Sequence, residues 1–271
     1  AIFKLANATD TTIACSNIGA YLSGNGGISL SGTCGNYTFT YDTTLISGCP
    51  INGLYHVEFT ATDACGNDSL FVINLTVKDT TPAIFSGVPA NITVTCISDV
   101  PPVPPLSSIT ATDDCAVMHT INFEQMTMDS LCPQNKKLIR KWIATNECGK
   151  KDTAIQIITI FDNVKPQYMV YPKDLFLYCG DASNTTKLNN WITTNASAMV
   201  MDNCGGSVIF TMSPVDTLNG CGNSNITQYS ITAMDSCGNS VTTYANVHLL
   251  DTLPPVITLP TATNSVACNG D

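Results

Sequence analysis

Short runs of alternating hydrophobic and polar residues dominate the chain. Residues 57–61 (Val-Glu-Phe-Thr-Ala) alternate strictly, which predicts a strand with one buried face. The apolar-rich runs 71–77 and 154–160 predict strands that close a β-sheet domain. Such segments are rich in Thr, Val, Ile, Tyr and Phe, and Gly, Pro, Asn and Asp separate them. This pattern is typical of an all-β sandwich.

Thirteen cysteines occur at a regular spacing. Three sets of four repeat at offsets of 81 to 89 residues, and Cys268 opens a fourth set. The sets are Cys15, Cys34, Cys49 and Cys65; Cys96, Cys115, Cys132 and Cys148; and Cys179, Cys204, Cys221 and Cys237. A fixed period indicates a tandem array. So many cysteines also indicate an oxidising compartment rather than the cytosol.

The residues around the last cysteine of each set repeat as well. Residues 59–67 read Phe-Thr-Ala-Thr-Asp-Ala-Cys-Gly-Asn, and similar stretches occupy residues 142–150 and 231–239. A proline-containing linker follows each stretch, at residues 79–82, 162–166 and 251–255. We therefore expect three immunoglobulin-like β-sandwich modules, at residues 1–81, 82–165 and 166–253, with residues 254–271 forming the first strand of a fourth.

Two segments depart from the strand pattern. Residues 184–192 predict a helix, because Leu188, Trp191 and Ile192 fall on one helical face. This helix lies in an insertion of the third module. The proline-rich residues 101–105 fill the same region of the second module and predict an extended polyproline segment.

Composition excludes several function classes. The net charge of −10 argues against a nucleic-acid partner, which requires a basic surface. No apolar run approaches the roughly 20 residues of a membrane span. Only three histidines, His56, His119 and His248, are available for acid–base catalysis or metal binding. There is no Gly-x-Ser-x-Gly elbow and no phosphate-binding glycine loop, so we expect no enzyme activity. The chain begins at Ala1 without a signal-peptide pattern, and we expect it to be part of a longer protein.

Spacing favours disulfides over a zinc cluster, because zinc sites use Cys-x₂₋₄-Cys and the closest cysteines here are 15 residues apart. Within one module, four cysteines allow three connectivities. The third and fourth cysteines are 16 residues apart across a predicted strand, so they lie at opposite ends of the sandwich and cannot bond.

An immunoglobulin-like strand order places the first and third cysteines at one end and the second and fourth at the other. We therefore expect six bonds, all within modules: Cys15–Cys49, Cys34–Cys65, Cys96–Cys132, Cys115–Cys148, Cys179–Cys221 and Cys204–Cys237. Cys268 is expected to pair outside the fragment.

The repeated motif resembles a known family. Thr-Ala-Thr-Asp-x-Cys-Gly-Asn, the threonine-rich strand after it and the linkers Asp-Thr-Thr-Pro and Asp-Thr-Leu-Pro-Pro resemble hyalin-repeat-like, immunoglobulin-type modules. The four-cysteine version is similar to arrays in giant Bacteroidota cell-surface proteins, including gliding-motility adhesins exported by type IX secretion. The first module departs from this pattern at Cys34, which follows Ser-Gly-Thr. The resemblance implies an extracellular stalk or adhesive fibre.

Aspartates in the predicted end loops and linkers are candidate calcium ligands. In a head-to-tail array the linker residue Asp79 would approach the next module's end loop, which carries Asp113 and Asp114. Calcium takes six to eight oxygen ligands, several of them from carboxylates. The alternative is that these aspartates hydrogen-bond their own turns.

Glycosylation is a further candidate. Asp-Ser/Thr followed by an aliphatic residue or threonine resembles the O-glycosylation signal of Bacteroidota. It occurs at Thr11, Thr43, Ser69, Thr80, Ser130, Thr153, Thr217 and Thr252. Asn-x-Ser/Thr sequons also occur, at Asn7, Asn36, Asn67, Asn74, Asn91, Asn184, Asn195 and Asn225.

These features together predict a non-catalytic structural or adhesive segment of a long extracellular fibre. Its expected partners are neighbouring repeats, surface glycans or lateral copies of the fibre. The alternative is a set of accessory carbohydrate-binding modules from a secreted enzyme, which would present an exposed row of aromatic side chains. Trp142 shares the register of Phe59 and Ile231 and is expected in the core, whereas Trp191 fits either the core or a sugar-stacking platform.

Overall fold

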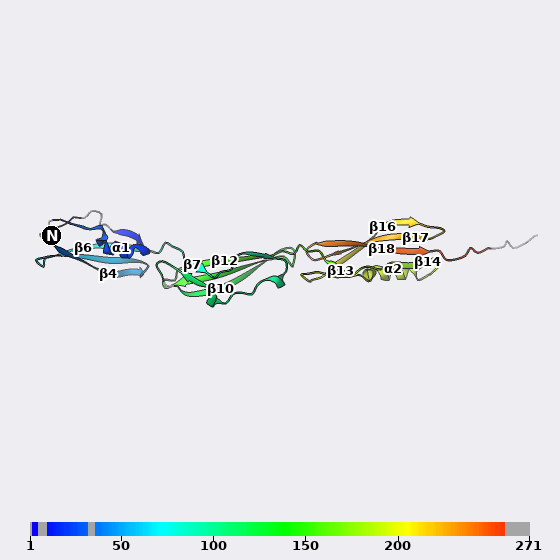
Figure 1. Ribbon diagram of the computed structural model, residues 1–271, viewed down its shortest axis with the longest axis horizontal. Helices are drawn as coiled ribbons and strands as arrows, with labels where there is room; N and C mark the ends of the chain where they lie inside the picture. The colour runs from blue at the N-terminus through cyan, green and yellow to red at the C-terminus, as the bar shows by residue number, and fades with distance from the viewer. Residues whose placement is uncertain (1, 5–9, 32–35, 117, 258–271) are drawn as a thin grey trace, which may run out of the picture. The chain divides into compact units, whose positions relative to one another are not determined.

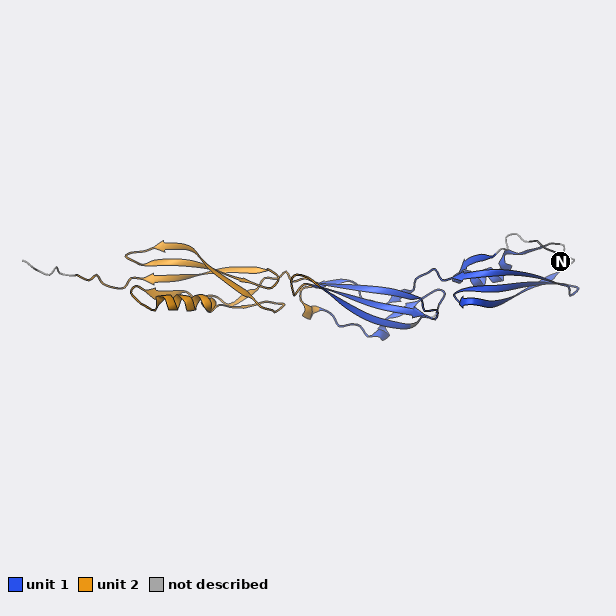
Figure 2. Ribbon diagram, turned by 180° about the vertical axis from the view of Figure 1, so that it is seen from behind, with its two compact units in different colours: residues 1–93, 100–128, 136–159 blue, residues 94–99, 129–135, 160–271 orange. Residues whose placement is uncertain are grey.

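The computed structural model describes residues 2–4, 10–31, 36–116 and 118–257 (Figure 1). The chain divides into two compact units (Figure 2). Unit 1 comprises residues 1–93, 100–128 and 136–159, and unit 2 comprises residues 94–99, 129–135 and 160–271. Each unit is built from β-strands with a few short helices, which confirms the predicted all-β class of tandem immunoglobulin-like domains.

The first module has a four-stranded and a two-stranded sheet. Its strands are β1 (Ile2–Lys4), β2 (Thr11–Ala14), β3 (Ser29–Ser31), β4 (Tyr37–Cys49), β5 (Asn52–Asp63) and β6 (Asp68–Lys78). The larger sheet has the order β2-β6-β5-β4, with β2 parallel to β6 and the other pairs antiparallel. β1 pairs with β3. Between β2 and β3 lie the helix α1 (Ile18–Ser23) and two 3-10 turns, Cys15–Asn17 and Asn25–Gly27.

The second module repeats this arrangement without an α-helix. Its strands are β7 (Ile84–Ser86), β8 (Ile92–Val94), β9 (Thr110–Thr112), β10 (Met118–Asp129), β11 (Lys136–Asn146) and β12 (Lys151–Ile160). They form a sheet of order β10-β11-β12-β8 and the pair β7-β9. Two 3-10 turns, Ile97–Asp99 and Leu106–Ser108, flank the proline-rich segment.

The third module, like the first, contains an α-helix. Its elements are β13 (Gln167–Val170), β14 (Leu175–Tyr178), α2 (Asn184–Thr193), the 3-10 turn Asn195–Ser197, β15 (Met199–Met201), β16 (Ile209–Asn219), β17 (Asn225–Met234) and β18 (Ser240–Leu250). The sheets are β14-β18-β17-β16, with β14 parallel to β18, and β13-β15. The predicted module boundaries stay a prediction. Of the predicted fourth-module strand, residues 254–257 have no regular secondary structure and the rest lies outside the described residues.

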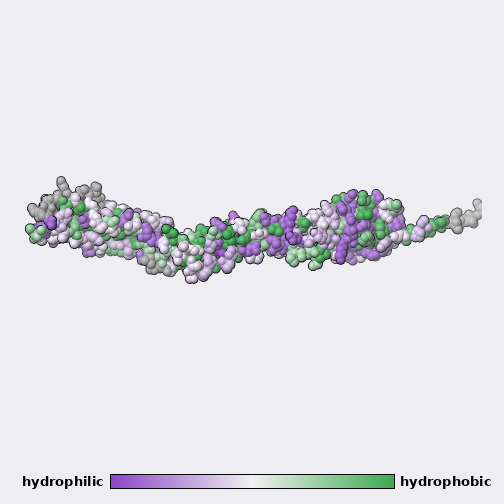
Figure 3. All heavy atoms as spheres, in the orientation of Figure 1, coloured by the Kyte–Doolittle hydropathy of each residue, from purple (hydrophilic) through white to green (hydrophobic). Residues whose placement is uncertain are grey.

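Alternation in the sequence correctly marks the buried faces. Val57, Phe59 and Ala61 on β5 are at most 1% exposed. Trp142 on β11 and Ile231 on β17 share the register of Phe59, and all three side chains are fully buried. The predicted core position of Trp142 is therefore confirmed. Each module builds its own core around the equivalent central strand. On the face drawn in Figure 3, hydrophobic and hydrophilic residues are interspersed along the surface.

The helical segments cover the same region in different ways. The predicted helix at residues 184–192 is confirmed as α2, and Trp191 packs edge-on against Tyr229 with its ring centroid 5.3 Å away. Trp191 Nε1 also donates to the carbonyl of Lys173 at 2.7 Å, so this side chain belongs to the core rather than to a sugar platform. The helix α1 was not predicted, because it has only six residues and includes Gly19.

The second module holds its proline-rich segment with a buried arginine. Residues 101–105 have no regular secondary structure, and Pro105 adopts φ −60°, ψ 141°, as a polyproline segment requires. Arg140 is 3% exposed and donates to the carbonyl of Pro101 at 2.8 Å and to Gln125 at 3.0 Å. Burial lowers the pKa of the Arg140 guanidinium. These hydrogen bonds replace the helix that covers this region in the other modules.

Candidate functional site

The cysteines lie at the two ends of the four-stranded sheets. Cys15 directly follows β2, which runs parallel to β6 and ends beside Lys78. Cys49 is the last residue of β4, at the same end of β6. Cys65 follows β5 at the opposite end of that 12-residue strand. The expectation that third and fourth cysteines lie too far apart to bond agrees with this arrangement.

Each disulfide, however, joins consecutive modules. The first junction consists of Cys15–Cys115 and Cys49–Cys148, with Cα separations of 5.6 and 5.7 Å. The second junction consists of Cys96–Cys204 and Cys132–Cys237, with Cα separations of 5.0 and 4.9 Å. These separations lie in the normal range for disulfides. At both junctions, the first cysteine of one module bonds the second of the next, and the third bonds the fourth.

The predicted pairing within modules is therefore wrong. Cys15–Cys49, Cys96–Cys132, Cys115–Cys148 and Cys204–Cys237 are replaced by bonds between modules. Cys179–Cys221 also fails, because both of these cysteines are free thiols, as is Cys65. The predicted Cys34–Cys65 bond involves a cysteine that the structure does not describe. Cys34 and Cys268 lie outside the described residues. The two disulfides assigned to each module in the predicted fold are likewise shared between neighbours.

The physical reason is the short linker. A few residues connect β6 to β7, so the end loops of the second module meet the end of the first module at which Cys15 and Cys49 lie. Cys115 and Cys148 pack against the hydrophobic cluster of the first module. At the second junction, Cys96 and Cys132 likewise bond into the third module, so residues 94–99 and 129–135 belong to unit 2.

The fourth cysteine of every module lies in the same turn. A side-chain oxygen two residues before the cysteine accepts hydrogen bonds from the cysteine N–H and from the N–H two residues after it. These acceptors are Asp63, Asn146 and Asp235, at distances of 2.8 to 2.9 Å. The intervening glycine adopts φ between +78° and +88° in all three turns, which favours glycine there. The sequence therefore presents each fourth cysteine on a preformed loop.

The first junction carries a compensated buried carboxylate. The side chain of Asp79, in the linker, is 2% exposed, and Lys150 Nζ lies 3.1 Å from its Oδ1. Lys150 also donates to the carbonyl of Thr81, and Thr81 donates to Asp114. Among the described residues, Asp79 accepts no hydrogen bond, so the ion pair is what compensates its burial.

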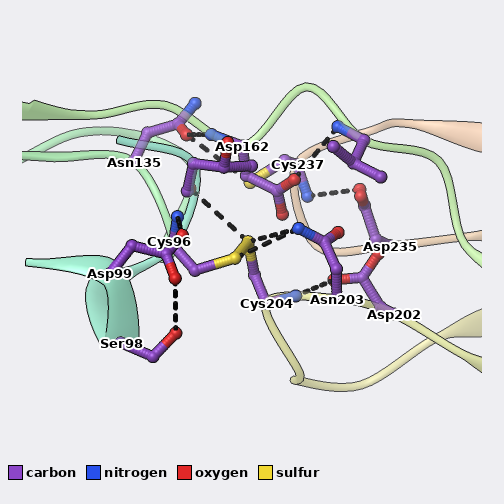
Figure 4. Close-up of a disulfide and its surroundings, with 12 residues drawn as sticks. Cys96, Ser98, Asp99, Asn135, Asp162, Asp202, Asn203, Cys204, Asp235 and Cys237 are labelled. Atoms are coloured by element: carbon purple, nitrogen blue, oxygen red, sulfur yellow. Dashed lines mark hydrogen bonds between the residues drawn. A yellow bond between two sulfur atoms is a disulfide. The ribbon is translucent and has the colours of Figure 1, made fainter. Parts of the chain in front are cut away.

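The second junction carries three buried carboxylates instead (Figure 4). Asp162, Asp202 and Asp235 are 3%, 8% and 4% exposed. Within the described parts of the chain, no basic side chain forms an ion pair with any of them. Burial, then repulsion from Asp202 and Asp235, raises the pKa of Asp162 above its ordinary value. The residue equivalent to Lys150 is Asn239, which donates to Asp235 Oδ2 at 2.9 Å and to the Asp162 carbonyl at 3.2 Å.

The Cys96–Cys204 disulfide lies beside these carboxylates. Asn203 Nδ2 donates a hydrogen bond to Cys96 Sγ, one of the two sulfurs of this disulfide, at 3.1 Å (Figure 4). Carboxylate oxygens of Asp162 and Asp202 lie within 4.8 Å of each other, and the Oδ2 atom of each is buried without a hydrogen-bond partner. This arrangement offers oxygen ligands to a cation. Sequence reasoning placed these aspartates in loops and linkers, but did not select them as a cluster.

The predicted calcium ligands at the first junction are only partly brought together. Asp113 and Asp114 lie within 4.8 Å of each other, and Asp113 Oδ2 is buried without a partner. Asp79 groups separately with the sulfurs of Cys15 and Cys115, which are disulfide-bonded and unavailable as thiolate ligands. Lys150 already supplies a positive charge to Asp79.

The predicted O-glycosylation residues lie on the surface to different degrees. Thr80, Ser130, Thr153, Thr217 and Thr252 are exposed, whereas Thr11, Thr43 and Ser69 are half-buried. None of the helices in the described part of the chain has both the length and the hydrophobicity needed to cross a membrane.

No protein-family model and no curated protein matches the sequence. Among solved structures, mouse protocadherin-24 EC1-3 aligns over 92% of this chain and 98% of its own, with 9% identity and a TM-score of 0.30. Protocadherin gamma B7 cadherin domains 1-4 aligns over 79% of this chain and 67% of its own (12% identity, TM-score 0.30). Drosophila N-cadherin EC1-4 covers 82% and 69% (11% identity, TM-score 0.24). At such low TM-scores, the likeness says nothing about function.

Proposed function

We propose that this chain is a non-catalytic structural or adhesive segment of a long extracellular fibre or stalk at the cell surface. The observation that supports this proposal is the reciprocal disulfide pattern, which adds two covalent bonds to the backbone linker at each junction. Disulfides persist in oxidising compartments. The same junction occurs twice, and repetition favours a structural role, because a catalytic site need occur only once.

The pairing limits how far the chain can be stretched. Force applied at the two ends follows the shortest covalent path, through Cys15–Cys115 and Cys132–Cys237, which bypass 100 and 105 residues. About 66 of the 271 residues then bear the extension, or about 230 Å of chain at about 3.5 Å per residue. Bonds confined to single modules would leave about 160 residues, or about 560 Å, free to extend. Joining the modules therefore makes a far less extensible fibre.

Force spectroscopy on the full chain, held by its two ends, tests this proposal. We expect a final contour length of about 230 Å under oxidising conditions and about 950 Å after reduction. The reduced chain is the internal control for attachment. An oxidised contour length near 560 Å would show that the bonds do not join modules and would remove the mechanical basis of the proposal.

The wider setting follows from the sequence resemblance. We assign the segment to an array similar to the hyalin-repeat-like, four-cysteine modules of giant Bacteroidota surface proteins. In such an array, many copies of a weakly adhesive module bind a surface through multivalency. Neighbouring repeats are the first partners, and surface glycans or lateral copies of the fibre are the others. We include O-glycosylation at the exposed Asp-Thr and Asp-Ser positions in this proposal. An intact mass equal to the sequence mass less the disulfide hydrogens would exclude it.

A separate observation supports cation binding at the second junction. Asp162 and Asp202 each bury an oxygen that has no hydrogen-bond partner, and Asp235 adds a third buried carboxylate nearby. Calcium prefers carboxylate oxygens and would neutralise this charge. The prediction of calcium at Asp79, Asp113 and Asp114 also stands as a proposal, although Lys150 already compensates Asp79 there.

Thermal unfolding in calcium and in chelator tests both cation sites. Asp202→Asn should abolish the calcium-dependent shift of the second junction, because the amide oxygen still accepts from the N–H of Cys204 but carries no charge. Asp113→Asn is the matched variant at the first junction, where the acceptor for Cys115 is likewise kept. An unfolding midpoint that is the same in calcium and in chelator contradicts cation binding at both.

One observation favours carbohydrate binding as a second candidate function. Phe176 and Tyr178 on β14 and Tyr244 on β18 are 52%, 46% and 56% exposed, and Phe176 stacks on His248 with centroids 4.6 Å apart. Exposed aromatic faces of this kind can stack on sugar rings. A glycan-binding assay with Phe176→Ala and Tyr178→Ala tests this candidate, with Tyr37→Ala as the control on another module. Binding that is unchanged in both β14 variants contradicts it.

A further inference from the structure

Three cysteines in the described part of the chain have no disulfide: Cys65, Cys179 and Cys221. Cys65 is the fourth cysteine of the first module, and the other two are the first and third of the third module. We propose that Cys179 and Cys221 form a covalent docking half-site for another four-cysteine module, and that Cys65 belongs to the complementary half-site. This inference rests on the proposed function as a repeat array. It identifies the cysteines through which the first and third modules would bond further modules.

The bonded turn at the second junction shows what such a half-site requires. The N–H of Asn135 donates to the carbonyl of Cys132 at 3.0 Å. The side-chain oxygen of Asn135 accepts from the N–H of Asp162 at 2.7 Å, and Asp162 Oδ1 accepts from the N–H of Val164 at 3.2 Å. This network ties the turn that carries Cys132 to the linker aspartate, and Cys132 is bonded to Cys237.

The turn around the free Cys221 repeats that network. The N–H of Ser224 donates to the carbonyl of Cys221 at 3.2 Å. The hydroxyl of Ser224 accepts from the N–H of Asp251 at 2.9 Å, and Asp251 Oδ1 accepts from the N–H of Leu253 at 3.2 Å. Cys179 lies at the same end, where its N–H donates to the carbonyl of Leu250 at 2.9 Å. The docking half-site is thus built as at the second junction, but its sulfurs are unbonded.

The turn that carries Cys65 is also preformed. Asp63 accepts from the N–H groups of Cys65 and Asn67 at 2.9 Å, as Asn146 and Asp235 do around the bonded fourth cysteines. Cys65 and Cys221 are both exposed, whereas free cysteines are usually buried. Two exposed thiols on turns that elsewhere carry disulfides therefore point to bonds with another module.

Each new bond converts two thiols to one disulfide and releases two protons and two electrons. A small-molecule disulfide accepts the electrons by exchange. One protein thiolate attacks it and releases a small thiol, and the partner's thiolate then attacks the mixed disulfide and releases a second. Once Cys221 has bonded to the fourth cysteine of a partner module, closure at Cys179 is intramolecular and hence favoured.

The test uses the full chain carrying Cys268→Ser, incubated at high concentration with oxidised glutathione. We expect covalent oligomers at integer multiples of the chain mass, reversal by reductant, and a peptide that links Cys221 to Cys65. The chain carrying Cys179→Ser with Cys221→Ser lacks one half-site. The chain carrying Cys34→Ser with Cys65→Ser lacks the other. Each variant alone should remain monomeric, and their mixture should form a dimer and nothing longer.

Three results would overturn the inference: a Cys179–Cys221 bond within one chain, symmetric Cys65–Cys65 or Cys221–Cys221 links in statistical proportion, or a chain that stays monomeric under oxidation. None of these alters the contour length expected for the bonds inside the chain. Failure of this inference is therefore distinguishable from failure of the proposed function.

Discussion

The two junctions share a covalent scheme but differ in how they handle buried charge. Both join the first and third cysteines of one module to the second and fourth of the next. The first junction pairs its linker aspartate, Asp79, with Lys150. The second places Asp162 near two further buried carboxylates and has Asn239 in place of the lysine. The same pair of disulfides therefore accommodates an ion pair at one junction and a cluster of unpaired buried carboxylates at the other.

The difference indicates which interactions the junction needs. Since the turns around the bonded cysteines keep the same hydrogen bonds at both junctions, the turns and the disulfides fix the geometry. The charges around them are then free to vary, and at the second junction they leave carboxylate oxygens available for a cation. Substitutions that change one of these features at a time separate their contributions to stability.

Removal of a disulfide should have the largest effect. We expect Cys49→Ser with Cys148→Ser, and Cys132→Ser with Cys237→Ser, each to cost about 2–4 kcal/mol. The chain-entropy model gives about 4.7 kcal/mol for a loop of about 100 residues, and the bond that remains at the junction reduces this. Denaturant unfolding followed by tryptophan fluorescence measures this loss, with Trp142 reporting on the second module and Trp191 on the third when the other tryptophan is replaced by Phe. Equal stability of the variants and the parent chain would contradict the assigned bonds.

Replacing the linker aspartate by asparagine should change the stability of the chain in opposite directions at the two junctions. In chelator at neutral pH, Asp79→Asn should destabilise the chain by about 1–3 kcal/mol, because it removes the partner of Lys150 from a buried site. Asp162→Asn should stabilise it by about 0.5–1 kcal/mol, because it removes one of three buried like charges. The same unfolding assay in calcium should reverse the sign for Asp162→Asn. Effects of equal sign in chelator would show that the junctions do not differ electrostatically.

The stability of the second junction should also depend on pH. The pKa of Asp162 is raised by burial and by Asp202 and Asp235, so in the pH range between its unfolded and folded pKa values the folded chain holds a proton that the unfolded chain has lost. The contribution of this group to stability is present below its unfolded pKa of about 3.8 and is lost as pH rises through the raised folded value. Unfolding measured in chelator across that range should therefore show a difference between Asp162→Asn and the parent that grows with pH. A constant difference is the contradictory outcome.

Introducing a lysine at the second junction, at the position equivalent to Lys150, should have a smaller effect on stability. Asn239→Lys places a cation at the position equivalent to Lys150, next to Asp162 and Asp235. We expect a gain of about 0.5–1 kcal/mol in chelator and a weaker response to calcium. The reciprocal variant, Lys150→Asn, should lose stability at the first junction. A calcium response that is unchanged in Asn239→Lys would argue that the cation does not bind there.

The smallest effect is expected for Asp235→Asn. Asn146 accepts the same backbone hydrogen bonds in the equivalent turn at the first junction, so an amide keeps the turn. The substitution loses the hydrogen bond that Asp235 Oδ2 accepts from Asn239, and it also relieves the repulsion between Asp235 and Asp162, so the two effects on stability oppose each other. We expect a change within about 0.5 kcal/mol in chelator. A loss well above that would mean that the charge of Asp235, and not only its oxygen, holds the turn.

Local pattern predicted much of the fold. Alternation identified the buried face of β5, because successive side chains of a strand point to opposite faces and this period of two is visible in the sequence. The shared register of Phe59, Trp142 and Ile231 identified the core. The spacing of Leu188, Trp191 and Ile192 identified α2. The helix α1 was missed because six residues carry too little periodicity.

The disulfide partners could not be read from spacing in the same way. The separation of Cys49 and Cys65 by β5 correctly excludes a bond between them, but placement at the same end does not distinguish pairing within a module from pairing with the next module. The actual partners are 99 to 108 residues apart, and their contact depends on where the next module docks. The argument that brought Asp79 towards the next module's end loops applied equally to the cysteines. The cluster of three carboxylates at the second junction was not predicted, because it too forms only where the third module docks on the second.

Peptide mapping of the full chain under non-reducing conditions tests the central claim most directly. The account predicts linked peptides that contain Cys49 with Cys148 and Cys132 with Cys237, together with free thiols at Cys65, Cys179 and Cys221 in material that has not been oxidised. Peptides that link Cys15 to Cys49, or Cys204 to Cys237, would contradict it.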